Sequence, residues 1–383
     1  MPRKLQLMMV CDWFYPAYKA GGPVVSTTNL AQALRGSYDV RVLTSDTDHG
    51  DQQPCVTESD AWIPFNGVQV QYLSQTHRSW RRLFATYRSL SPDVWYLNHL
   101  YSPKFVLLPL LMHALGLLKG RLVLCPRGGL NPSAVQYKAY KKKPLIWFLN
   151  GLGIARRITF HATNEWEAGH IRRHFPAARV EIADNFPVPY AGPPAPIVKE
   201  PSVIRLLFVG RVVDIKNLRF LLGVLKTCPF KGSLEIIGPL EDIEYWRQCE
   251  EDIKQLPGNL EVRYLGAMPQ GQVREHLERC HFFVLPTRGE NYGHAIVEAW
   301  MAGKPVIISD QTPWRNLSAQ HVGWDLPLDA AAWHRILEDI STWDNHTYQS
   351  WIKAIDEHAK KLAERKDLLQ RYEEVFGVVS AFA

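Results

Sequence analysis

Short apolar runs alternate with longer segments of helical pattern along the first half of the chain. Several of the apolar runs are continuous, as in strands of a parallel sheet that is covered on both faces. One helical segment opens with Pro23, a residue favoured in the first turn of a helix. The predicted strands are Leu5–Cys11, Val40–Thr44, Val68–Leu73, Val94–Asn98, Leu122–Pro126, Ile158–His161 and Val180–Ala183, and the predicted helices include Pro23–Leu34, Pro103–Leu118 and Asn164–His174.

The segment from Pro187 to Pro201 interrupts this pattern with six prolines in 15 residues. Neither a helix nor a strand interior tolerates that density, so we place a domain boundary there. Beyond it the alternation restarts, and from Ala330 onward the pattern is helical throughout. The predicted strands are Val203–Val209, Ser233–Ile237, Leu260–Leu265, His281–Leu285 and Pro305–Ser309, with helices at Asn217–Lys226, Asp242–Gln255 and Gln270–Arg279.

Repeated strand–helix units predict an α/β fold of two doubly wound, Rossmann-like domains that face a cleft. The expected domains are residues 1–187 and 202–365, joined by a proline-rich linker at 188–201. Ligands of such sheets bind at the carboxyl ends of the strands, so the chemistry is expected there.

Composition and charge limit the choice of partner. The 383 residues are 46% hydrophobic and 21% charged, as in a globular protein, and the formal net charge is +6. This excess suits an anionic partner such as a nucleotide, a lipid phosphate or an anionic membrane. The sequence contains neither a long basic run nor a recognised nucleic-acid motif, so we expect no nucleic acid partner.

The cysteines and the apolar segments indicate a cytoplasmic protein. None of the six cysteines forms a C-x-x-C pair, which favours a reducing compartment. The first apolar run, Leu5 to Cys11, is too short for a secretion signal. The longest one, Phe105 to Leu118, is shorter than the roughly 20 residues that span a bilayer and is read as a buried helix.

A second segment, Tyr137 to Arg157, mixes lysines and arginines with Trp147, Phe148 and Leu149. Such a mixture can lie on an anionic membrane surface. It can equally be the solvated face of an ordinary helix, and the sequence leaves both open.

The first candidate residues for chemistry follow the first strand of the second half. Gly210 allows close approach of the backbone, and Arg211 and Lys216 lie at or just past the carboxyl end of that strand. Lys216 is also near a helix N-terminus, where the dipole disfavours a cation by about 0.3–1 kcal/mol. A bound diphosphate would compensate for that placement, whereas the alternative is an exposed loop lysine.

Two glutamates, Glu290 and Glu298, flank the start of a helix predicted near Gly293. The backbone N–H groups at a helix start suit an anion. Glu298 is too deep in the helix to cap it and could accept hydrogen bonds from a ribose diol, while Glu290 could reach a sugar hydroxyl. Carboxylates repel a diphosphate, so the phosphate charge would fall to Arg211 and Lys216.

With these residues at these positions, the sequence resembles the group-1 family of retaining glycosyltransferases with the GT-B architecture. The matching stretches in the second half are Gly210-Arg211 with Lys216-Asn217, Ile237-Gly238-Pro239, Tyr264-Leu265-Gly266, Glu290 to Glu298, and Ala302-Gly303-Lys304-Pro305-Val306. In the first half, Phe14-Tyr15-Pro16 and Gly21-Gly22-Pro23 are similar to the glycine loop of that family.

The resemblance implies a reaction and a set of residues. A sugar would move from a nucleoside diphosphate to an acceptor hydroxyl with retention of configuration, without a metal or other cofactor. Residues 366–383 would form a helix that crosses back onto the first domain. Glu290 would hold the donor sugar as a catalytic residue, and the donor would be bound by Gly21, Gly22, Arg211, Lys216, Gly238, Leu265, Asn291, Tyr292, Gly293, His294 and Glu298.

One position departs from the family pattern. Many members carry a histidine after the strand that reads Leu122–Cys125 here, where this sequence has Pro126-Arg127-Gly128. A surface-polysaccharide branch has a similar motif, and Trp314 also suits that branch. Arg127 is therefore expected to neutralise phosphate charge or to orient the acceptor, but it cannot carry a proton because it stays charged. His99 and Glu165 are candidate acceptor ligands, with structural roles as the alternative for each.

Other signals do not change this interpretation. Asp46-Thr47-Asp48 matches a metal-binding D-x-D, but its Asp- and His-rich surroundings favour a turn. The sequence has no P-loop or full dinucleotide fingerprint and no metal-ligand histidine spacing, which disfavours an ATPase, a hydride-transfer enzyme and a metal site.

We therefore predict a cytoplasmic glycosyltransferase that acts on a glycan or lipid-linked acceptor in surface polysaccharide synthesis. The inner face of the cell membrane is a second expected location. A nucleotide-sugar epimerase of the same fold is one alternative. A membrane- or nucleic-acid-binding scaffold with a defunct nucleotide site is the other.

Overall fold

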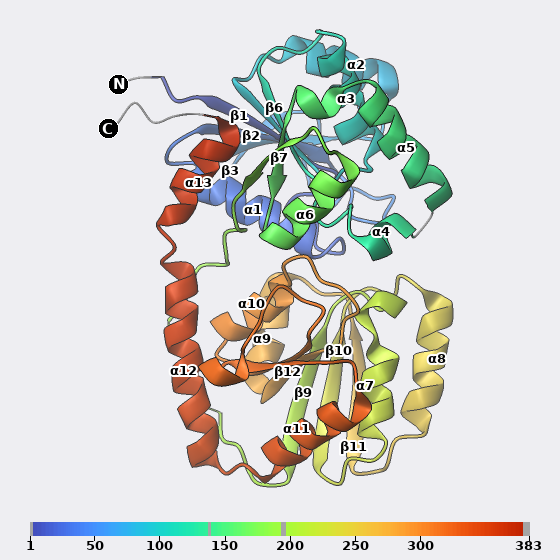
Figure 1. Cartoon of the computed structure of the whole chain (residues 1–383), viewed down its shortest axis with the longest axis vertical. Coiled ribbons are helices and arrows are strands. Elements are labelled where there is room, and N and C mark those ends of the chain that lie inside the picture. The colour runs from blue at the N-terminus through green and yellow to red at the C-terminus, as the bar shows by residue number, and fades with distance from the viewer. Residues whose placement is uncertain (1–2, 137–138, 193–196, 378–383) are drawn as a thin grey trace. The chain divides into compact units, whose positions relative to one another are not determined.

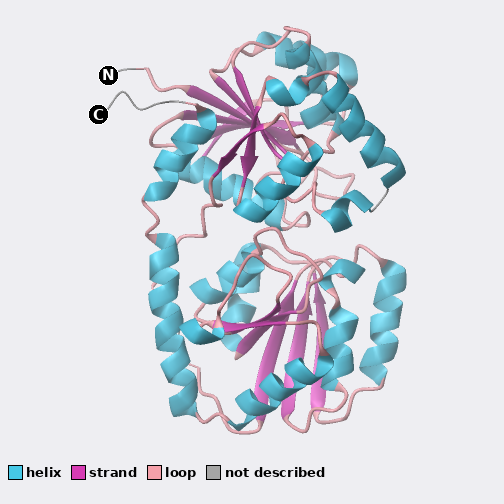
Figure 2. Cartoon of the chain, viewed as in Figure 1, coloured by secondary structure: helices cyan, strands magenta, loops and turns pink. Residues whose placement is uncertain are grey.

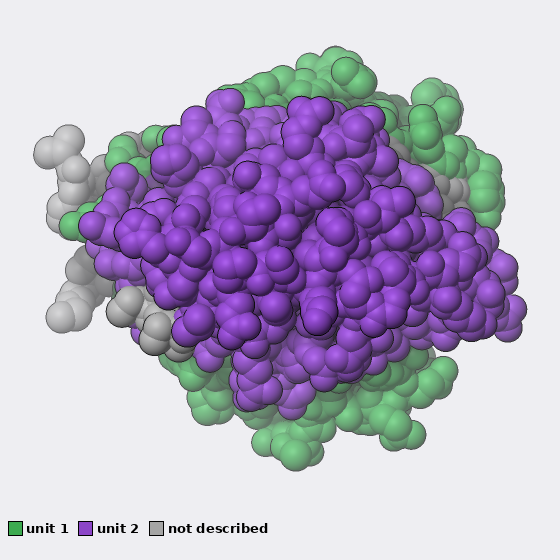
Figure 3. Space-filling view, turned by 90° about the horizontal axis from the view of Figure 1, so that it is seen from below, with its two compact units in different colours: residues 1–186, 366–383 green, residues 187–365 purple. Residues whose placement is uncertain are grey.

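The computed structural model describes residues 3–136, 139–192 and 197–377. The chain divides into two compact units, residues 1–186 with 366–383 and residues 187–365, which Figure 3 shows in different colours. Each unit is built on a mainly parallel sheet with helices packed against it, as Figure 2 shows. The division falls between Phe186 and Pro187, at the start of the proline-rich segment.

The first unit contains an eight-stranded sheet in the order β3-β4-β2-β1-β5-β6-β7-β8. Every pairing is parallel except that of β3 with β4. The order reverses at β1, and β1 and β5 are therefore the central neighbours. The strands are β1 (Gln6–Val10), β2 (Asp39–Ser45), β3 (Trp62–Phe65), β4 (Val68–Leu73), β5 (Val94–Asn98), β6 (Arg121–Cys125), β7 (Thr159–Ala162) and β8 (Arg179–Ile182).

Helices cover this sheet in two separate hydrophobic clusters. One cluster contains residues of α1 and α13, and the other contains residues of α2, η1, α3, α5 and α6. The bounds are α1 (Gly22–Leu34), α2 (Trp80–Ser89), η1 (Pro103–Leu107), α3 (Leu108–Ala114), α4 (Pro132–Gln136), α5 (Ala139–Gly151), η2 (Ile154–Arg156), α6 (Glu165–His174) and α13 (Asp367–Phe376) (Figure 1).

The last helix, α13, belongs to the first unit although its residues follow the whole of the second unit in the sequence. Tyr372 stacks on Phe186 at a centroid distance of 5.2 Å, and its hydroxyl donates to the Asp184 carbonyl over 3.3 Å. Phe376 packs edge-on against Tyr96 at 5.8 Å. Tyr96, Tyr372 and Phe376 are buried and Phe186 is partly buried, so α13 completes the hydrophobic core of the unit.

The second unit contains a six-stranded sheet in the order β11-β10-β9-β12-β13-β14, and every pairing is parallel. The strands are β9 (Val203–Val209), β10 (Lys231–Ile237), β11 (Leu260–Gly266), β12 (Phe282–Leu285), β13 (Val306–Ser309) and β14 (Gly323–Leu326). The other elements are η3 (Asp214–Lys216), α7 (Leu218–Leu225), α8 (Ile243–Lys254), α9 (Gln270–Arg279), α10 (His294–Met301), η4 (Ser318–Gln320), α11 (Ala330–Thr342) and α12 (Asn345–Ala363).

The sequence missed some elements for identifiable reasons. β3 and β14 are edge strands whose apolar pattern is interrupted, by Pro64 in one and by Gly323 and Asp325 in the other, and the ten residues of α2 include three arginines. The segment predicted as one helix at Pro103–Leu118 is wrong in detail. It forms a π-helical turn, η1, followed by α3, which ends at Ala114.

Free thiols and helices that are short or polar characterise the described part of the chain. All six cysteines are free thiols, and five of them are buried. None of the helices that the structure describes is both long enough and apolar enough to cross a bilayer.

Candidate functional site

The carboxyl ends of β9 and β10 form the edge at which the donor residues were predicted. The Gly210 N–H donates to the Ile237 carbonyl over 2.9 Å. Gly238 has φ 147°, and a Cβ atom at this position would lie 1.9 Å from the Gly210 oxygen. Because only glycine permits so close an approach, Gly238 is required to close this edge of the sheet.

Lys216 and Glu290 meet just beyond this edge. Lys216 ends η3, and Asn217 leaves that turn with φ 58° to begin α7. The Lys216 ammonium forms an ion pair with the Glu290 carboxylate, and the two side chains are 15% and 18% exposed. The carboxylate therefore provides the negative charge that a lysine beside a helix N-terminus needs. Two residues predicted to contact different parts of a donor thus contact each other.

The loop between β12 and α10 is fixed at both sides of Glu290. The Arg288 N–H donates to the Ile215 carbonyl over 2.7 Å, which ties the loop to η3. The Glu290 N–H donates to the Gln311 carbonyl over 3.0 Å, which ties it to the segment after β13. Backbone contacts therefore hold Glu290 opposite Lys216.

Gly293 turns the chain from this loop into α10. It has φ 80°, and a Cβ atom there would lie 2.6 Å from Cδ1 of Ile296 and 3.2 Å from Cγ of Glu290. As the N-cap it has no side chain to bond the first N–H groups of α10. Asn291 and His294 are half-buried on either side of this turn.

Trp314 supports the same turn from the segment after β13. Its indole N–H donates to the Tyr292 carbonyl over 2.5 Å, and its ring lies 5.5 Å from the Tyr292 ring. It also packs edge-on against Trp300 of α10 at 4.9 Å. The sequence associates Trp314 with the surface-polysaccharide branch of the family, but it does not predict these contacts with the turn before α10.

Glu298 lies in the second turn of α10 and accepts a hydrogen bond from Nε2 of Gln270 over 2.8 Å. Burial raises the pKa of Glu298 to about 7, against the lowering effect of the Gln270 hydrogen bond. Gln270 is the first residue of α9, and its position in the sequence gave no sign of this role.

The other predicted donor residues of the second unit lie at the same sheet edge. Arg211 follows β9 by two residues and pairs with Glu241, with side chains 40% and 37% exposed. An exposed ion pair of this kind contributes little to stability, so Arg211 can leave Glu241 for another anionic partner. Leu265 is half-buried near the end of β11, the strand beside β10.

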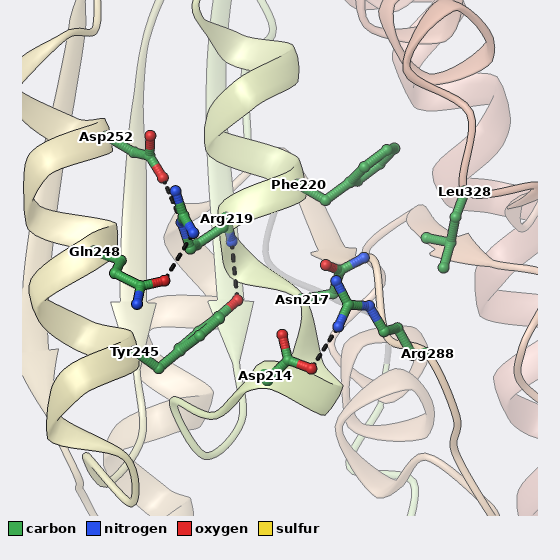
Figure 4. Close-up of a pocket in the computed structure, with 9 residues that line it drawn as sticks. All are labelled: Asp214, Asn217, Arg219, Phe220, Tyr245, Gln248, Asp252, Arg288 and Leu328. Atoms are coloured by element: carbon green, nitrogen blue, oxygen red, sulfur yellow. Dashed lines mark hydrogen bonds and ion pairs between the residues drawn. The ribbon is translucent and has the colours of Figure 1, made fainter. Parts of the chain in front are cut away.

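A pocket of about 460 Å³ lies on the α7 and α8 side of η3 (Figure 4). Arg219 pairs there with Asp252 at 2.7 Å, and Arg288 pairs with Asp214. Both arginines are thus neutralised by carboxylates, and none of the predicted donor residues lines the pocket. The full lining is Asp214, Asn217, Arg219, Phe220, Tyr245, Gln248, Asp252, Arg288 and Leu328.

In the first unit, Arg127 follows the end of β6 by two residues and has φ 54°. Its guanidinium donates to Oδ1 of Asn98 from Nε and Nη2 over 3.2 and 3.1 Å, to Oη of Tyr96 over 3.2 Å, and to Oδ1 of Asn185. These acceptors are all uncharged. They hold the arginine in place without neutralising it, as a site for an anionic ligand requires.

His161 fixes the direction of this network. Its Nε2 donates to the Ala183 carbonyl over 2.8 Å, so Nδ1 accepts the Tyr96 hydroxyl proton over 2.7 Å. Burial lowers the pKa of His161 to about 3, which keeps the ring neutral. Because the Tyr96 hydroxyl donates its proton to His161, the Tyr96 oxygen can accept the hydrogen bond from Nη2 of Arg127. Of this network the sequence identified Arg127 alone.

The acceptor candidates lie near the same strand ends. His99 follows β5 with φ 74°, and its N–H donates to the Cys125 carbonyl over 2.9 Å. Glu165 is 82% exposed on α6, within 3.8 Å of Arg172. The buried carboxylate of this region is Glu167, which accepts from the N–H of Gly128 over 2.6 Å.

The glycine loop and the D-x-D stretch lie next to each other. Gly21, with φ 69°, is the N-cap of α1, and Gly22 is its first residue. Asp48 accepts from the Tyr18 N–H over 2.8 Å and so supports this loop. Among the described residues no three His, Cys, Asp or Glu side chains gather as a metal site would need.

Comparison with protein families covers both units. The family described as "Glycosyl transferases group 1" matches residues 196–343, and the family described as "Glycosyl transferase 4-like domain" matches residues 21–185. The chain belongs to the group-1 glycosyltransferases. A curated relative, an uncharacterised glycosyltransferase of Methanocaldococcus jannaschii, is 30% identical over 102 residues, which is 26% of this chain and 27% of that protein.

Solved structures confirm the GT-B fold that the sequence predicts. The chain matches sucrose-phosphate synthase from Thermosynechococcus elongatus with a TM-score of 0.73, 17% identity and coverage of 98% and 100% of the two chains. It matches HepE of Anabaena, solved with UDP and glucose, with a TM-score of 0.69, 14% identity and the same coverage. WaaG, a glycosyltransferase involved in lipopolysaccharide biosynthesis, matches with a TM-score of 0.64, 16% identity and coverage of 98% and 100%.

Proposed function

We propose that this glycosyltransferase moves a sugar from a nucleoside diphosphate to a hydroxyl of a glycan or lipid-linked acceptor, with retention of configuration. The observation that carries the proposal is the half-buried ion pair of Lys216 and Glu290 at the carboxyl end of β9. An unliganded site for a diphosphate sugar needs its cation and its sugar-binding carboxylate close together, and mutual pairing stabilises both until the donor arrives. UDP and UDP-glucose in the solved structures of the Anabaena neighbour support a nucleotide sugar as donor.

In the proposed mechanism the diphosphate replaces Glu290 as the partner of Lys216, with Arg211 as a second cation. Glu290 then accepts a hydrogen bond from a hydroxyl of the donor sugar. The Glu298 carboxylate accepts from the ribose, and the N–H groups at the start of α10 face the same donor. The two cations neutralise the phosphates, so we propose that no metal is required.

The reaction exchanges one bond at the anomeric carbon for another. The bond between that carbon and the diphosphate oxygen breaks, and a bond to the acceptor oxygen forms on the same face of the sugar. The acceptor proton passes to the departing diphosphate, since Arg127 stays charged and cannot accept it. Arg127, held by uncharged acceptors, is proposed to stabilise negative charge or to orient the acceptor.

The Pro126-Arg127-Gly128 motif and Trp314 favour an acceptor in surface polysaccharide synthesis, and we propose that the enzyme works on the cytoplasmic side of the membrane. The likeness to WaaG, a glycosyltransferase involved in lipopolysaccharide biosynthesis, supports the same acceptor class.

The first test is thermal stabilisation of the purified protein by UDP, GDP, ADP and their sugar conjugates. A nucleotide at about 100 times its Kd should stabilise by about 2.7 kcal/mol. Lys216→Ala and Glu298→Ala should abolish the stabilisation. Lys226 directly follows α7 and pairs with Asp252 of α8 at 3.0 Å, and Lys226→Ala should retain the stabilisation. A lack of stabilisation by every nucleotide would refute the donor site and favour the scaffold interpretation.

The second test separates transfer from epimerisation. The stabilising nucleotide sugar is incubated with and without a glycan acceptor, and the products are followed by NMR. A glycosidic product with the anomeric configuration of the donor supports the proposal. An isomerised nucleotide sugar that forms without acceptor, or a product of inverted configuration, contradicts it.

A further inference from the structure

Helix α5 of the first unit has apolar residues on two opposite faces. Ile146 and Leu149 are buried in the hydrophobic cluster beneath it. On the other side of α5, which lies at the outside of the unit in Figure 1, apolar residues at helical spacing are exposed to solvent. A contiguous exposed apolar face of this kind marks a binding surface, because the fold gains nothing from it. Its residues are Tyr140 (72% exposed), Trp147 (77%), Phe148 (46%) and, just past the helix end, Leu152 (40%).

Exposed basic side chains accompany this face. Lys141 and Lys143 lie on α5, and Arg156 follows it in η2. Arg157, just beyond η2, is also exposed, but its Nη1 donates to the Ala114 carbonyl over 2.9 Å. Lys142 does not belong to the surface, because its ammonium donates to the Ala134 carbonyl over 2.6 Å.

The charge around this face is strongly one-sided. Residues 74–179 contain 17 Lys and Arg against three Asp and Glu, an excess of 14, whereas the whole chain has an excess of 6. One of the three acids, Glu167, is buried and bonded to Gly128 and Thr163. Another, Asp93, pairs with Arg3 at 3.4 Å. The part of the chain that carries α5 is therefore nearly free of exposed negative charge.

We propose that α5 and the turn after it, residues 139–157, bind the surface of a bilayer that contains anionic lipids. The aromatic rings would lie at the boundary of headgroups and acyl chains, with the lysines and arginines on the lipid phosphates. Charge decides between this partner and a second copy of the chain, since two copies joined through α5 would place one basic surface against another. This inference rests on the proposed function, because membrane binding would serve an enzyme whose acceptor is anchored in lipid and is reached from the bilayer surface.

The experiment is co-sedimentation of the full chain with vesicles of phosphatidylcholine alone and of phosphatidylcholine with phosphatidylglycerol. We expect binding to the anionic vesicles only, and loss of that binding as salt is raised. Trp147→Ala should weaken binding about tenfold or more by removing apolar contact. Neutralising both charges in Lys141→Gln with Lys143→Gln should weaken it by a similar factor.

A matched control comes from α8 of the second unit, which also exposes an apolar and a basic residue. Ile243 is 54% exposed, and the side chain of Arg247 is 70% exposed. Ile243→Ala with Arg247→Gln should bind anionic vesicles as the wild type does. Nucleotide stabilisation, measured on every variant, should be unchanged, so a failure of vesicle binding is distinguishable from a failure of the donor site.

Three results would overturn the proposal. Wild-type protein could remain in the supernatant with both kinds of vesicle. The α5 variants could bind as tightly as the wild type. Analytical ultracentrifugation could show a dimer that Trp147→Ala dissociates, which would make this face an interface between copies.

Discussion

Lys216 and Glu290 form an ion pair at the end of the central strand β9, with both side chains mostly shielded from solvent. Each is predicted to contact a donor, Lys216 through the diphosphate and Glu290 through the sugar. Donor binding and the breaking of this pair are therefore expected to be one event.

Glu290→Gln should separate affinity from turnover. The amide keeps the shape of the side chain but leaves the Lys216 cation without its counter-charge, so a nucleoside diphosphate should bind several-fold more tightly. Transfer should fall by about 10²-fold, because a charged contact to the sugar is lost. Calorimetry with the nucleotide and turnover of the donor measure the two effects. Glu241→Gln, which breaks the exposed pair with Arg211, is the control and should change both little. A fall in nucleotide affinity for Glu290→Gln would refute this reading of the pair.

Glu298 should make stability depend on pH. Its pKa is raised by burial to about 7, above the value of the unfolded chain. Below about pH 4 the carboxyl is protonated in both states and has no effect on stability. As pH rises towards 7 the unfolded chain releases the proton more readily, and the folded state loses stability up to about pH 7.

Glu298→Gln should therefore have a higher Tm than the wild type at about pH 8 and an equal Tm at about pH 4. Thermal unfolding at the two pH values measures the difference. A difference of the same size at both would show that packing, and not ionisation, is responsible.

Arg127 should act in turnover and not in nucleotide binding. Arg127→Met removes a held cation and should lower kcat by about 10²-fold. Tyr96→Phe keeps the cation but removes one of its acceptors and should cause a smaller loss. Nucleotide stabilisation should be unchanged in both, since the predicted diphosphate ligands lie in the second unit. Arg179→Met, at a paired and 65% exposed arginine on β8, is the control. Equal kcat for Arg127→Met and wild type would contradict the role.

Gly238→Ala should destabilise the second unit by several kcal/mol, because the new methyl would lie 1.9 Å from the Gly210 oxygen. Gly258→Ala meets nothing within 4 Å and should be nearly neutral. Urea unfolding of the two variants gives the comparison. Similar stabilities would mean that the sheet edge can shift to accept a side chain.

The sequence predicted most of the fold because the buried parallel strands are continuous apolar runs. β4, β5 and β9 have the predicted bounds. The edge strands β3 and β14 were missed because Pro64 in one, and Gly323 and Asp325 in the other, interrupt the apolar run. For the site, the sequence identified charged residues at strand ends, such as Arg127 and Lys216. It could not identify Asn98, Asn185 or Gln270, since uncharged residues gain a role only from the side chains that folding brings beside them.

Arg127 shows this limit most clearly. Its acceptors come from β5 and from the segment after β8, and Asn185 lies 58 positions away in the chain. The direction of the hydrogen bonds depends on His161 and on the Ala183 carbonyl, which no motif marks. A pattern along the chain cannot reveal a network that exists only once the sheet has formed.

The placement of α13 determines the order in which the protein can be completed during synthesis. Phe376 of α13 packs on Tyr38 and Tyr96, and it is made only after the whole of the second unit. The second unit is continuous in sequence, so all of its residues have emerged from the ribosome while the first unit still lacks this helix. The unit that starts the chain is therefore the second to be finished, and a chain released before Tyr372 would carry an uncovered aromatic core to be recognised by chaperones and proteases.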